Sequence, residues 1–194
     1  MQPDPLLCWR REFPISERTS YLVSHSLGAM PLRARARVQR TLDRWDQRGV
    51  RAWAEGWWVA QNEIAAAVES ILGAAADTVS MHQNVAVASQ VILSCFDFSG
   101  PRRKIVLCDA EFPSVLYLYE GQRARGAEIV RVPSDEAGIG IDLDRLLKAI
   151  DERTLLVPIS HVLFRSAFIQ HARAIAARAR EVAAFLILAL LQST

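Results

Sequence analysis

The chain has 194 residues, of which 51% are hydrophobic and 23% are charged. This length suits one ordinary domain or a little more, and the composition excludes intrinsic disorder and low-complexity fibres. The 23 basic and 21 acidic residues give a net charge of +2, which excludes a generally basic nucleic-acid-binding protein. Only two of the basic residues, Lys104 and Lys148, are lysines.

The cysteines and histidines indicate neither a disulfide framework nor a metal site. Cys8, Cys95 and Cys108 are odd in number and have no CxxC spacing, so we predict reduced thiols, with Cys95 and Cys108 buried. The four histidines are scattered without paired spacing. The longest apolar run, 182–191, is about half as long as a membrane-spanning helix, and the N-terminus has no apolar run of signal length. We therefore expect a cytoplasmic protein.

Residues 1–51 form a predicted N-terminal segment that carries ten arginines and five acidic residues. Pro31 followed by Val38, Leu42 and Trp45 predicts an amphipathic helix that ends at Gly49. The charge excess could mark an arm that binds a polyanion. We favour a solvent-exposed helix face, because the basic residues are not interleaved with aromatic ones.

Residues 52–194 form the second predicted part, which begins with two helices. The first has Ile64, Val68, Ile71 and Leu72 on its expected buried face and ends at Gly73. The second is expected near 82–95, after a start at Thr78 or Ser80. Small and β-branched residues dominate this segment, so we predict a helix buried on most sides.

From residue 104 onward, short apolar runs alternate with helical segments. The predicted strands are 104–108, 128–132, 154–159 and 185–190, and the predicted helices are 114–125, 142–150 and 167–182. Strands separated by helices need crossover connections, which produce a mainly parallel sheet. The predicted fold class is therefore α/β, with a mainly parallel sheet and flanking helices.

This topology predicts a ligand crevice at the carboxyl ends of the strands. The loops at this edge are 109–113, 133–135, 160–165 and the stretch after Leu188. No GxGxxG follows the first strand and no Walker lysine is present, so neither common kind of nucleotide site is predicted.

Several short motifs, in their order and spacing, match one known group of enzymes. They are Ser26-Leu27-Gly28 with Pro31, Trp45 and Trp53, the string 81–85 (MHQNV), the string 111–114 (EFPS), the strand end 158–161 (PISH) and the final LxLALLQST. The sequence resembles the kynureninase branch of the class V aminotransferase-like enzymes, which are fold-type-I proteins dependent on pyridoxal phosphate (PLP). The resemblance implies the large-domain fold of PLP-dependent transferases, incomplete at the C-terminus.

The resemblance also implies cofactor-binding residues. Val85 and Ala86 match the start of a helix whose amides hold the PLP phosphate, although the family commonly has threonine in place of Ala86. Phe112 matches the ring that stacks on the cofactor, or it is a core residue beside the strand. The remaining matches are Pro113, Ser114, Ser160 and Gln192. Ser114 could instead, or in addition, cap the following helix, and Ser160 could be a turn residue.

Substrate contacts are implied for the loop that contains His25 and Ser26. The family often places asparagine where this chain has His25, which could bind substrate or cap a loop. Arg165 could hold a substrate carboxylate, although a surface arginine is the commoner explanation.

Two departures from the family pattern concern the chemistry itself. The aspartate that keeps the pyridine nitrogen protonated is replaced by Ala189. The lysine that holds PLP as a Schiff base lies, in the family, beyond residue 194. We expect neither Lys104 nor Lys148 to substitute, because one begins a strand at the edge away from the crevice and the other faces solvent. No catalytic residue is therefore assigned.

The resemblance implies a kynureninase-type hydrolase that cleaves a carbon–carbon bond of a kynurenine-like amino acid in tryptophan catabolism. We expect the chain by itself to be inactive. Another class V reaction, or a non-catalytic remnant that pairs with an intact homologue, are the alternatives. The expected partners are an amino-acid substrate and a second subunit in a homodimer or with a homologue, and neither nucleic acid nor a membrane.

Overall fold

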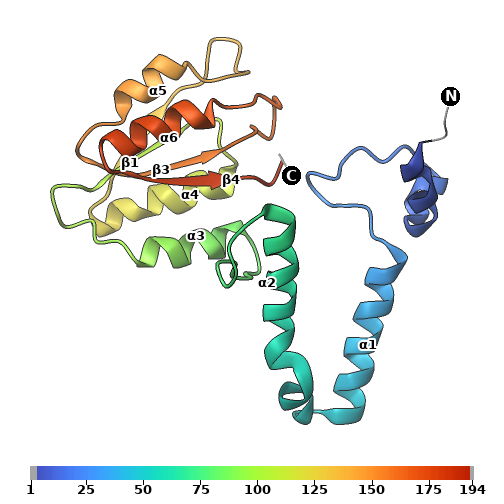
Figure 1. Cartoon of the computed structure of the whole chain (residues 1–194). Helices are drawn as coiled ribbons and strands as arrows, with labels where there is room; N and C mark the ends of the chain where they lie inside the picture. Colours follow the sequence, from blue (N-terminus) through green and yellow to red (C-terminus); the bar gives the residue numbers. More distant parts are fainter. Residues whose placement is uncertain (1–3, 193–194) are drawn as a thin grey trace. The chain divides into compact units, whose positions relative to one another are not determined.

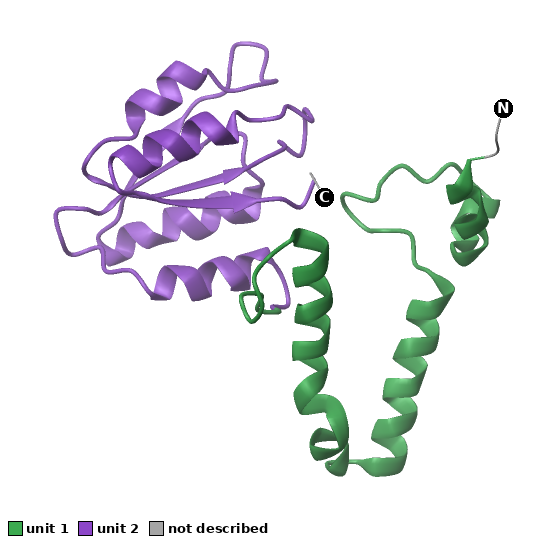
Figure 2. Ribbon diagram, in the orientation of Figure 1, with its two compact units in different colours: residues 1–81 green, residues 82–194 purple. Residues whose placement is uncertain are grey.

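The computed structural model describes residues 4–192, and the chain divides into two compact units, 1–81 and 82–194 (Figure 2). The boundary predicted after residue 51 falls inside the first unit, in the segment between its two long helices. The last two residues of the LxLALLQST motif lie outside the described residues.

The first unit is helical. The 3₁₀ helices η1 (Pro5–Glu12) and η2 (Pro14–Glu17) precede α1 (Leu32–Arg48), and the π-turn η3 (Trp53–Trp57) leads into α2 (Trp58–Leu72). Gly49 and Gly73 end the two long helices with positive φ angles of 51° and 64°, a conformation that glycine adopts at little cost. Both predicted helices are therefore confirmed.

The apolar faces of these two helices are not buried. Val38 and Trp45 of α1 are 60% and 63% exposed, and Ile71 of α2 is 82% exposed. Among the described residues of this unit, only Ala52, Ala65 and Glu69 are buried. The predicted buried face of α2 is thus wrong for Ile64, Ile71 and Leu72, which are at least 50% exposed, whereas Val68 is half-buried.

The second unit contains a four-stranded parallel sheet in the order β2-β1-β3-β4 (Figure 1). Its strands are β1 (Lys104–Cys108), β2 (Glu128–Val132), β3 (Thr154–Ser160) and β4 (Phe185–Ala189). All residues of β1 are buried, as expected for a central strand covered on both faces. The α/β class, the parallel sheet and the positions of its strands are confirmed.

Helices cover both faces of this sheet (Figure 1). On one face, α3 (Val85–Ser94) and α4 (Pro113–Glu120), which η4 (Gly121–Arg125) continues, pack through Leu93 and Tyr119 onto Ile105 and Leu156. On the other face, α5 (Leu143–Ala149) and α6 (Ala172–Glu181) pack through Leu146, Ile175 and Ala179 onto Val106 and Val157. Alternate residues of β1 thus belong to two separate cores.

Three predicted helix starts are corrected. Asn84, rather than Thr78 or Ser80, caps α3 by accepting a hydrogen bond from the Val87 amide at 2.9 Å. Pro113 begins α4, so the alternative that Ser114 is its N-cap is wrong. Proline suits the first helical position because its missing N–H group would have no acceptor there. The last helix begins at Ala172 and not at residue 167, because residues 162 and 169 form an antiparallel bridge.

Two burial predictions are also corrected. The helix α3 buries only Ser89 and Leu93, so the prediction that it is buried on most sides is wrong. Cys108 is buried as predicted, but Cys95, directly after α3, is exposed. None of the described helices is long and apolar enough to cross a membrane.

Candidate functional site

A pocket of about 430 Å³ lies at the carboxyl edge of the sheet, where the topology predicts a crevice. Residues from the starts of α3 and α4 and from the ends of β3 and β4 line it. The lining residues are Asn84, Val85, Ala86, Phe112, Ser114, Val115, Ser160, Phe164, Ala189, Leu191 and Gln192. Every cofactor-binding residue implied by the resemblance, except Pro113, is among them. Among the described residues that line this pocket, none is charged.

The start of α3 gives this pocket an electropositive end. Asn84 accepts two hydrogen bonds from this helix. The Val87 amide donates to its side-chain oxygen at 2.9 Å, and the Ala88 amide donates to its backbone carbonyl oxygen at 3.0 Å. The amides of Val85 and Ala86, at the first two positions of the helix, have no acceptor within it. A helix N-terminus of this kind favours an anion such as phosphate.

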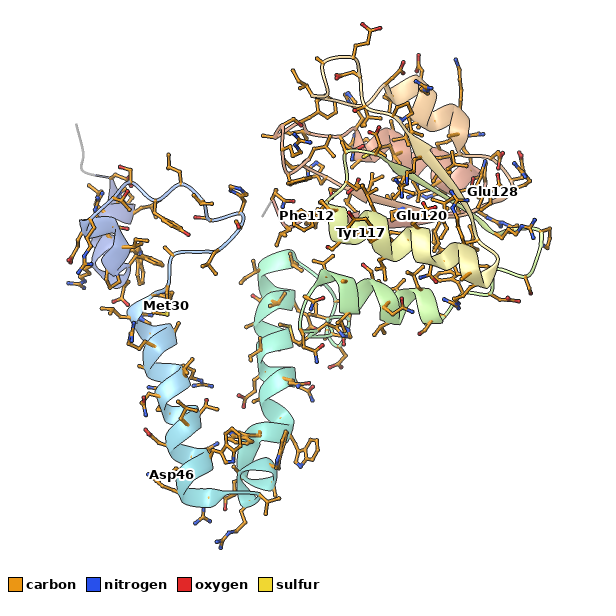
Figure 3. The ribbon with its side chains drawn as sticks, turned by 180° about the vertical axis from the view of Figure 1, so that it is seen from behind. Met30, Asp46, Phe112, Tyr117, Glu120 and Glu128 are labelled. Atoms are coloured by element: carbon orange, nitrogen blue, oxygen red, sulfur yellow. The ribbon has the colours of Figure 1, made fainter. Side chains whose placement is uncertain are left out.

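Two aromatic rings form one wall of the pocket. Phe112 and Phe164 meet edge to face, with ring centroids 4.9 Å apart and an angle of 69°. Phe112 is 49% exposed at the beginning of α4 (Figure 3), so the alternative that it is a core residue is contradicted. Its exposed ring offers a surface on which a flat ligand can stack.

A buried carboxylate, Glu111, lies directly behind the pocket. Its side chain is 2% exposed and accepts hydrogen bonds from the amide and the hydroxyl of Ser160, at 2.9 and 2.5 Å. Gln170 donates to the Ser160 carbonyl oxygen at 2.7 Å and to Glu111 at 3.5 Å. The alternative that Ser160 is a turn residue whose hydroxyl is satisfied by the backbone does not hold, because this hydroxyl donates to a carboxylate.

Glu111 also accepts a hydrogen bond from the thiol of Cys108, whose Sγ lies 3.2 Å from Oε1 of Glu111. Burial raises the pKa of this thiol well above its usual range, and the neighbouring Glu111 carboxylate raises it further. Cys108 is therefore a protonated donor at neutral pH and not a nucleophile.

Glu111 belongs to the motif 111–114 (EFPS), but no role was predicted for it. A signal was present, because an acidic residue stands three positions after a strand whose residues 105–108 are apolar. An acidic residue that is buried this fully needs several donors, and only the folded chain supplies them.

The two lysines lie away from this pocket. Lys104 begins β1 at the opposite edge of the sheet, is 4% exposed, and its Nζ lies 2.6 Å from Asp151 and 2.7 Å from the carbonyl oxygen of Ala149. Lys148 is exposed on α5. The predicted positions of both lysines are confirmed.

The other predicted site residues are exposed. His25 and Ser26 lie in an exposed turn of the first unit, before α1, and Arg165 is exposed in the loop after β3. None of the three lines the strand-end pocket. Their roles in substrate binding stay predictions.

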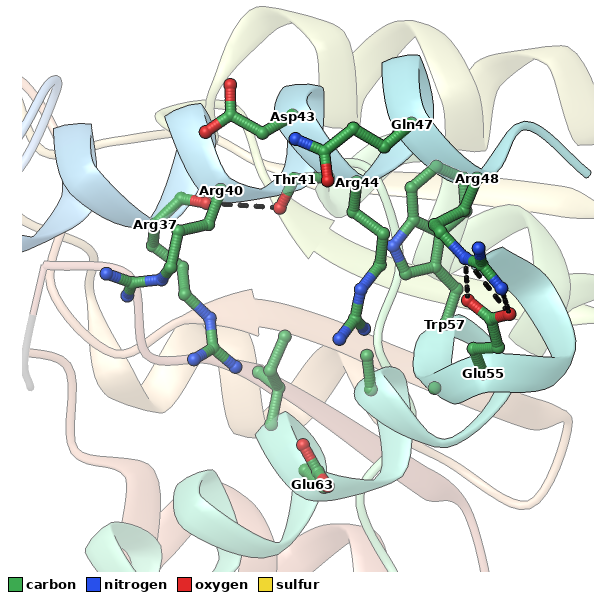
Figure 4. A pocket seen from close by; sticks show the side chains of 13 residues that line it. Arg37, Arg40, Thr41, Asp43, Arg44, Gln47, Arg48, Glu55, Trp57 and Glu63 are labelled. Atoms are coloured by element: carbon green, nitrogen blue, oxygen red, sulfur yellow. Dashed lines mark hydrogen bonds and ion pairs between the residues drawn. The ribbon is translucent and has the colours of Figure 1, made fainter. Parts of the chain in front are cut away.

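The first unit has a larger groove of about 710 Å³ between α1 and α2. Arg37, Arg40 and Arg44 extend from α1 into it toward the side of Glu63, and Arg48 pairs with Glu55 at 2.5 Å (Figure 4). These arginines are exposed, and the choice between a solvent-exposed helix face and an arm that binds a polyanion stays a prediction.

Comparison with known proteins identifies relatives of most of the chain. The family described as Aminotransferase class-V matches residues 38–193. The kynureninase of Bacillus anthracis is 29% identical over 187 residues, which cover 92% of this chain and 44% of that protein. The kynureninase of Burkholderia mallei (strain SAVP1) is 26% identical over 194 residues, or 95% of this chain and 45% of that protein. The chain thus spans less than half the length of these curated relatives.

Solved structures with the same fold are also found. A mutant of C-DES with glycine covalently linked to its PLP cofactor has a TM-score of 0.82 and 18% identity, and the match covers 100% of this chain and 51% of that one. The apo cysteine desulfurase from Thermococcus onnurineus NA1 has a TM-score of 0.71 and 16% identity, covering 97% and 48%. These likenesses establish the fold.

Proposed function

Because the chain belongs to the Aminotransferase class-V family, we propose that its strand-end pocket binds PLP and that the whole protein acts on an amino acid. PLP, when bound, supplies an electron-withdrawing ring that stabilises negative charge beside the amino group of the substrate. The kynureninases among the relatives favour hydrolytic carbon–carbon cleavage of a kynurenine-like amino acid. Another class V reaction is the alternative.

One observation carries the proposal: residues from four elements, each matched to a cofactor contact, line one pocket. The amides of Val85 and Ala86 would hold the phosphate at the start of α3. Phe112 would stack on the ring. The polar side chains of Ser114, Ser160 and Gln192 on the pocket wall would fix its orientation.

The chain lacks side chains with which the family strengthens its binding of PLP. We therefore propose that residues 1–194 bind PLP weakly and non-covalently. Ala86 provides no hydroxyl for the phosphate, and Ala189 provides no carboxylate for the ring. Lys104 is engaged by Asp151 at the opposite edge of the sheet, and Lys148 is exposed on α5, so neither amine reaches the pocket.

We further propose that the chain works in the cytoplasm and pairs with a second copy or an intact homologue. Large apolar side chains on the first unit, such as Trp45, Trp58 and Ile71, are 63%, 70% and 82% exposed, and extended apolar surface is typical of association sites. Sedimentation of the purified chain tests pairing with a second copy, since a folded monomer at all concentrations would contradict it.

The test of cofactor binding is calorimetric titration of the purified chain with PLP. We expect F112A to weaken binding roughly 2- to 12-fold, because an aromatic contact is worth about 0.5–1.5 kcal/mol. F185A is the matched control: Phe185 is also exposed and also meets one other ring, that of Phe96, at 5.2 Å. Phe185 lies outside the pocket, so F185A should bind PLP with the same affinity as the wild type.

Two further controls define the mode of binding. Pyridoxal, which lacks the phosphate, should bind more weakly than PLP if the start of α3 holds that group. Borohydride treatment should leave no PLP on Lys104 or Lys148. Absence of PLP binding to the wild-type chain, or equal loss in F112A and F185A, would contradict the proposal.

A further inference from the structure

The hydrogen bonds around Glu111 determine what Ser160 can offer to the pocket. Glu111 is 2% exposed and does not itself line the cavity, whereas Ser160 does. The shortest contact of the carboxylate, 2.5 Å, is with the Ser160 hydroxyl. This pair therefore connects a buried negative charge to the pocket wall.

The surroundings of Glu111 are those of an ionised carboxylate. The Ser160 backbone N–H and the Gln170 NH₂ group can only donate, and their nitrogen atoms lie 2.9 and 3.5 Å from Oε1. The Cys108 thiol, 3.2 Å from the same oxygen, adds a third donor. An ionised carboxylate accepts all of these bonds at once, and such bonds stabilise its charge.

A serine hydroxyl has one proton, and here that proton is directed to Oε2 of Glu111. What remains for the pocket is the lone pairs of the Ser160 oxygen. Ser160 therefore faces the cavity as a hydrogen-bond acceptor. The negative charge behind it strengthens this acceptor and favours a positively charged donor.

We propose that Glu111 is a positioning residue that makes Ser160 an acceptor for a protonated ring nitrogen in this pocket. The inference rests on the proposed binding of PLP. Its location fits, because Ser160 of β3 pairs in register with Ala189 of β4, and both residues line the cavity. The Glu111–Ser160 pair thus provides the negative charge that the apolar end of β4 does not.

The decisive variant is E111Q, which keeps the shape of the side chain. The amide oxygen of glutamine can still accept from the Ser160 backbone, but its NH₂ group would now face the Ser160 oxygen and donate to it. The Ser160 proton is then free to point into the pocket, so Ser160 changes from acceptor to donor.

The experiment compares PLP with 1-deaza-PLP, in which a C–H group replaces the ring nitrogen, by calorimetric titration of the full chain. We expect the wild type to prefer PLP at least about tenfold, as one charge-assisted hydrogen bond implies. E111Q should lose this preference. E128Q, on β2 beside Arg153 and outside the pocket, should retain it. Equal preference in wild type and E111Q would overturn the inference while leaving PLP binding intact.

Further measurements keep the inference testable if E111Q does not fold or PLP does not bind. S160A should lose the preference and S160T should retain it, while the thermal unfolding midpoints of both show that the fold persists. In the ligand-free wild type, the ¹³C resonance of the Glu111 carboxyl group at pH 7 should be that of a carboxylate and should move in S160A. A protonated carboxyl group would overturn the inference, whatever the result for PLP.

Discussion

The two units of this chain contain helices with equally clear sequence patterns, yet only one unit buries them. In the second unit, α5 and α6 pack their apolar sides against a parallel sheet. In the first, α1 and α2 leave Leu42, Trp45 and Ile71 exposed. The comparison shows that periodicity specifies a helix and the side it could bury, whereas burial depends on a partner surface. Since most helical stability comes from such packing, the first unit should be the weaker one.

The largest expected difference between the units comes from truncating one leucine in each. L156A removes a wholly buried side chain of β3 and should lower the free energy of unfolding of the second unit by about 2–5 kcal/mol. L42A, at a position of α1 that is 50% exposed, should change that of the first by no more than about 0.5 kcal/mol. Urea unfolding followed by amide NMR signals separates the units. Equal losses would show that α1 is buried in solution.

The second comparison uses two glycines with positive φ angles. In G126A, the new methyl carbon would lie 2.9 Å from the carbonyl oxygen of Phe98, whereas in G73A it would meet no atom within 4 Å. We expect G73A to cost about 1–2 kcal/mol from the backbone conformation alone. G126A should cost about 3 kcal/mol, because the clash adds to the same conformational cost. Thermal unfolding of both variants is the measurement, and a smaller loss in G126A would contradict the packing of Gly126 against Phe98.

The third prediction concerns the buried lysine at the far edge of the sheet. K104M removes the donor to Asp151 and to the carbonyl oxygen of Ala149, and should lower the free energy of unfolding by about 1–3 kcal/mol at pH 7. Burial opposes ionisation of Asp151, but the hydrogen bonds from Lys104 and the Arg153 amide, together with the positive charges of both side chains, outweigh it, so the pKa of this carboxyl is lowered.

A lowered folded-state pKa fixes the pH dependence of this pair. The stabilisation is present above the unfolded-state pKa of Asp151, about 3.9, and is lost as the pH falls through the folded-state pKa. The difference between wild type and K104M should therefore narrow below about pH 4. Urea unfolding midpoints between pH 2 and pH 7 provide the measurement, with K148M, which removes an exposed lysine, as the control. If the unfolding midpoints of wild type and K104M differed by the same amount at every pH, the ion pair would be excluded as the cause of the difference.

The smallest effect is expected at the exposed ion pair of the first unit. The hydrogen bond from Arg48 lowers the pKa of Glu55, so whatever the pair contributes is present at neutral pH and is lost in acid. Because both side chains are solvated, E55Q should hardly change the unfolding midpoint at neutral pH. Tryptophan fluorescence measures this directly, since all five tryptophans precede residue 82. A clear loss would show that this pair holds the turn between α1 and α2 together.

Local sequence patterns predicted the elements of the second unit well, where local signals are strong. The bounds of β1 and β2 agree with the prediction because both runs are short and rich in β-branched residues. The start of α6 was wrong because the bridge between residues 162 and 169 holds the preceding segment outside the helix. The prediction that Cys95 is buried was wrong, because apolar neighbours in sequence do not imply apolar neighbours in space.

The candidate site divides in the same way. The resemblance identified Val85, Phe112 and Ser160 separately, and the fold brings them to one pocket. Glu111 received no role, because the residues that make it meaningful, Ser160 and Gln170, lie 49 and 59 positions further along the chain. A buried carboxylate cannot be distinguished from a solvated one until its donors are known.

Amino-acid patterns were enough to predict the alternation of strands and helices, the parallel sheet and the edge at which a ligand would lie, because these depend on periodicity and on the geometry of crossover connections. Tertiary structure alone decided which apolar faces are buried and which hydroxyl faces the pocket as an acceptor. Both outcomes depend on contacts between residues far apart in the chain, and burial and hydrogen-bond direction are properties of such contacts.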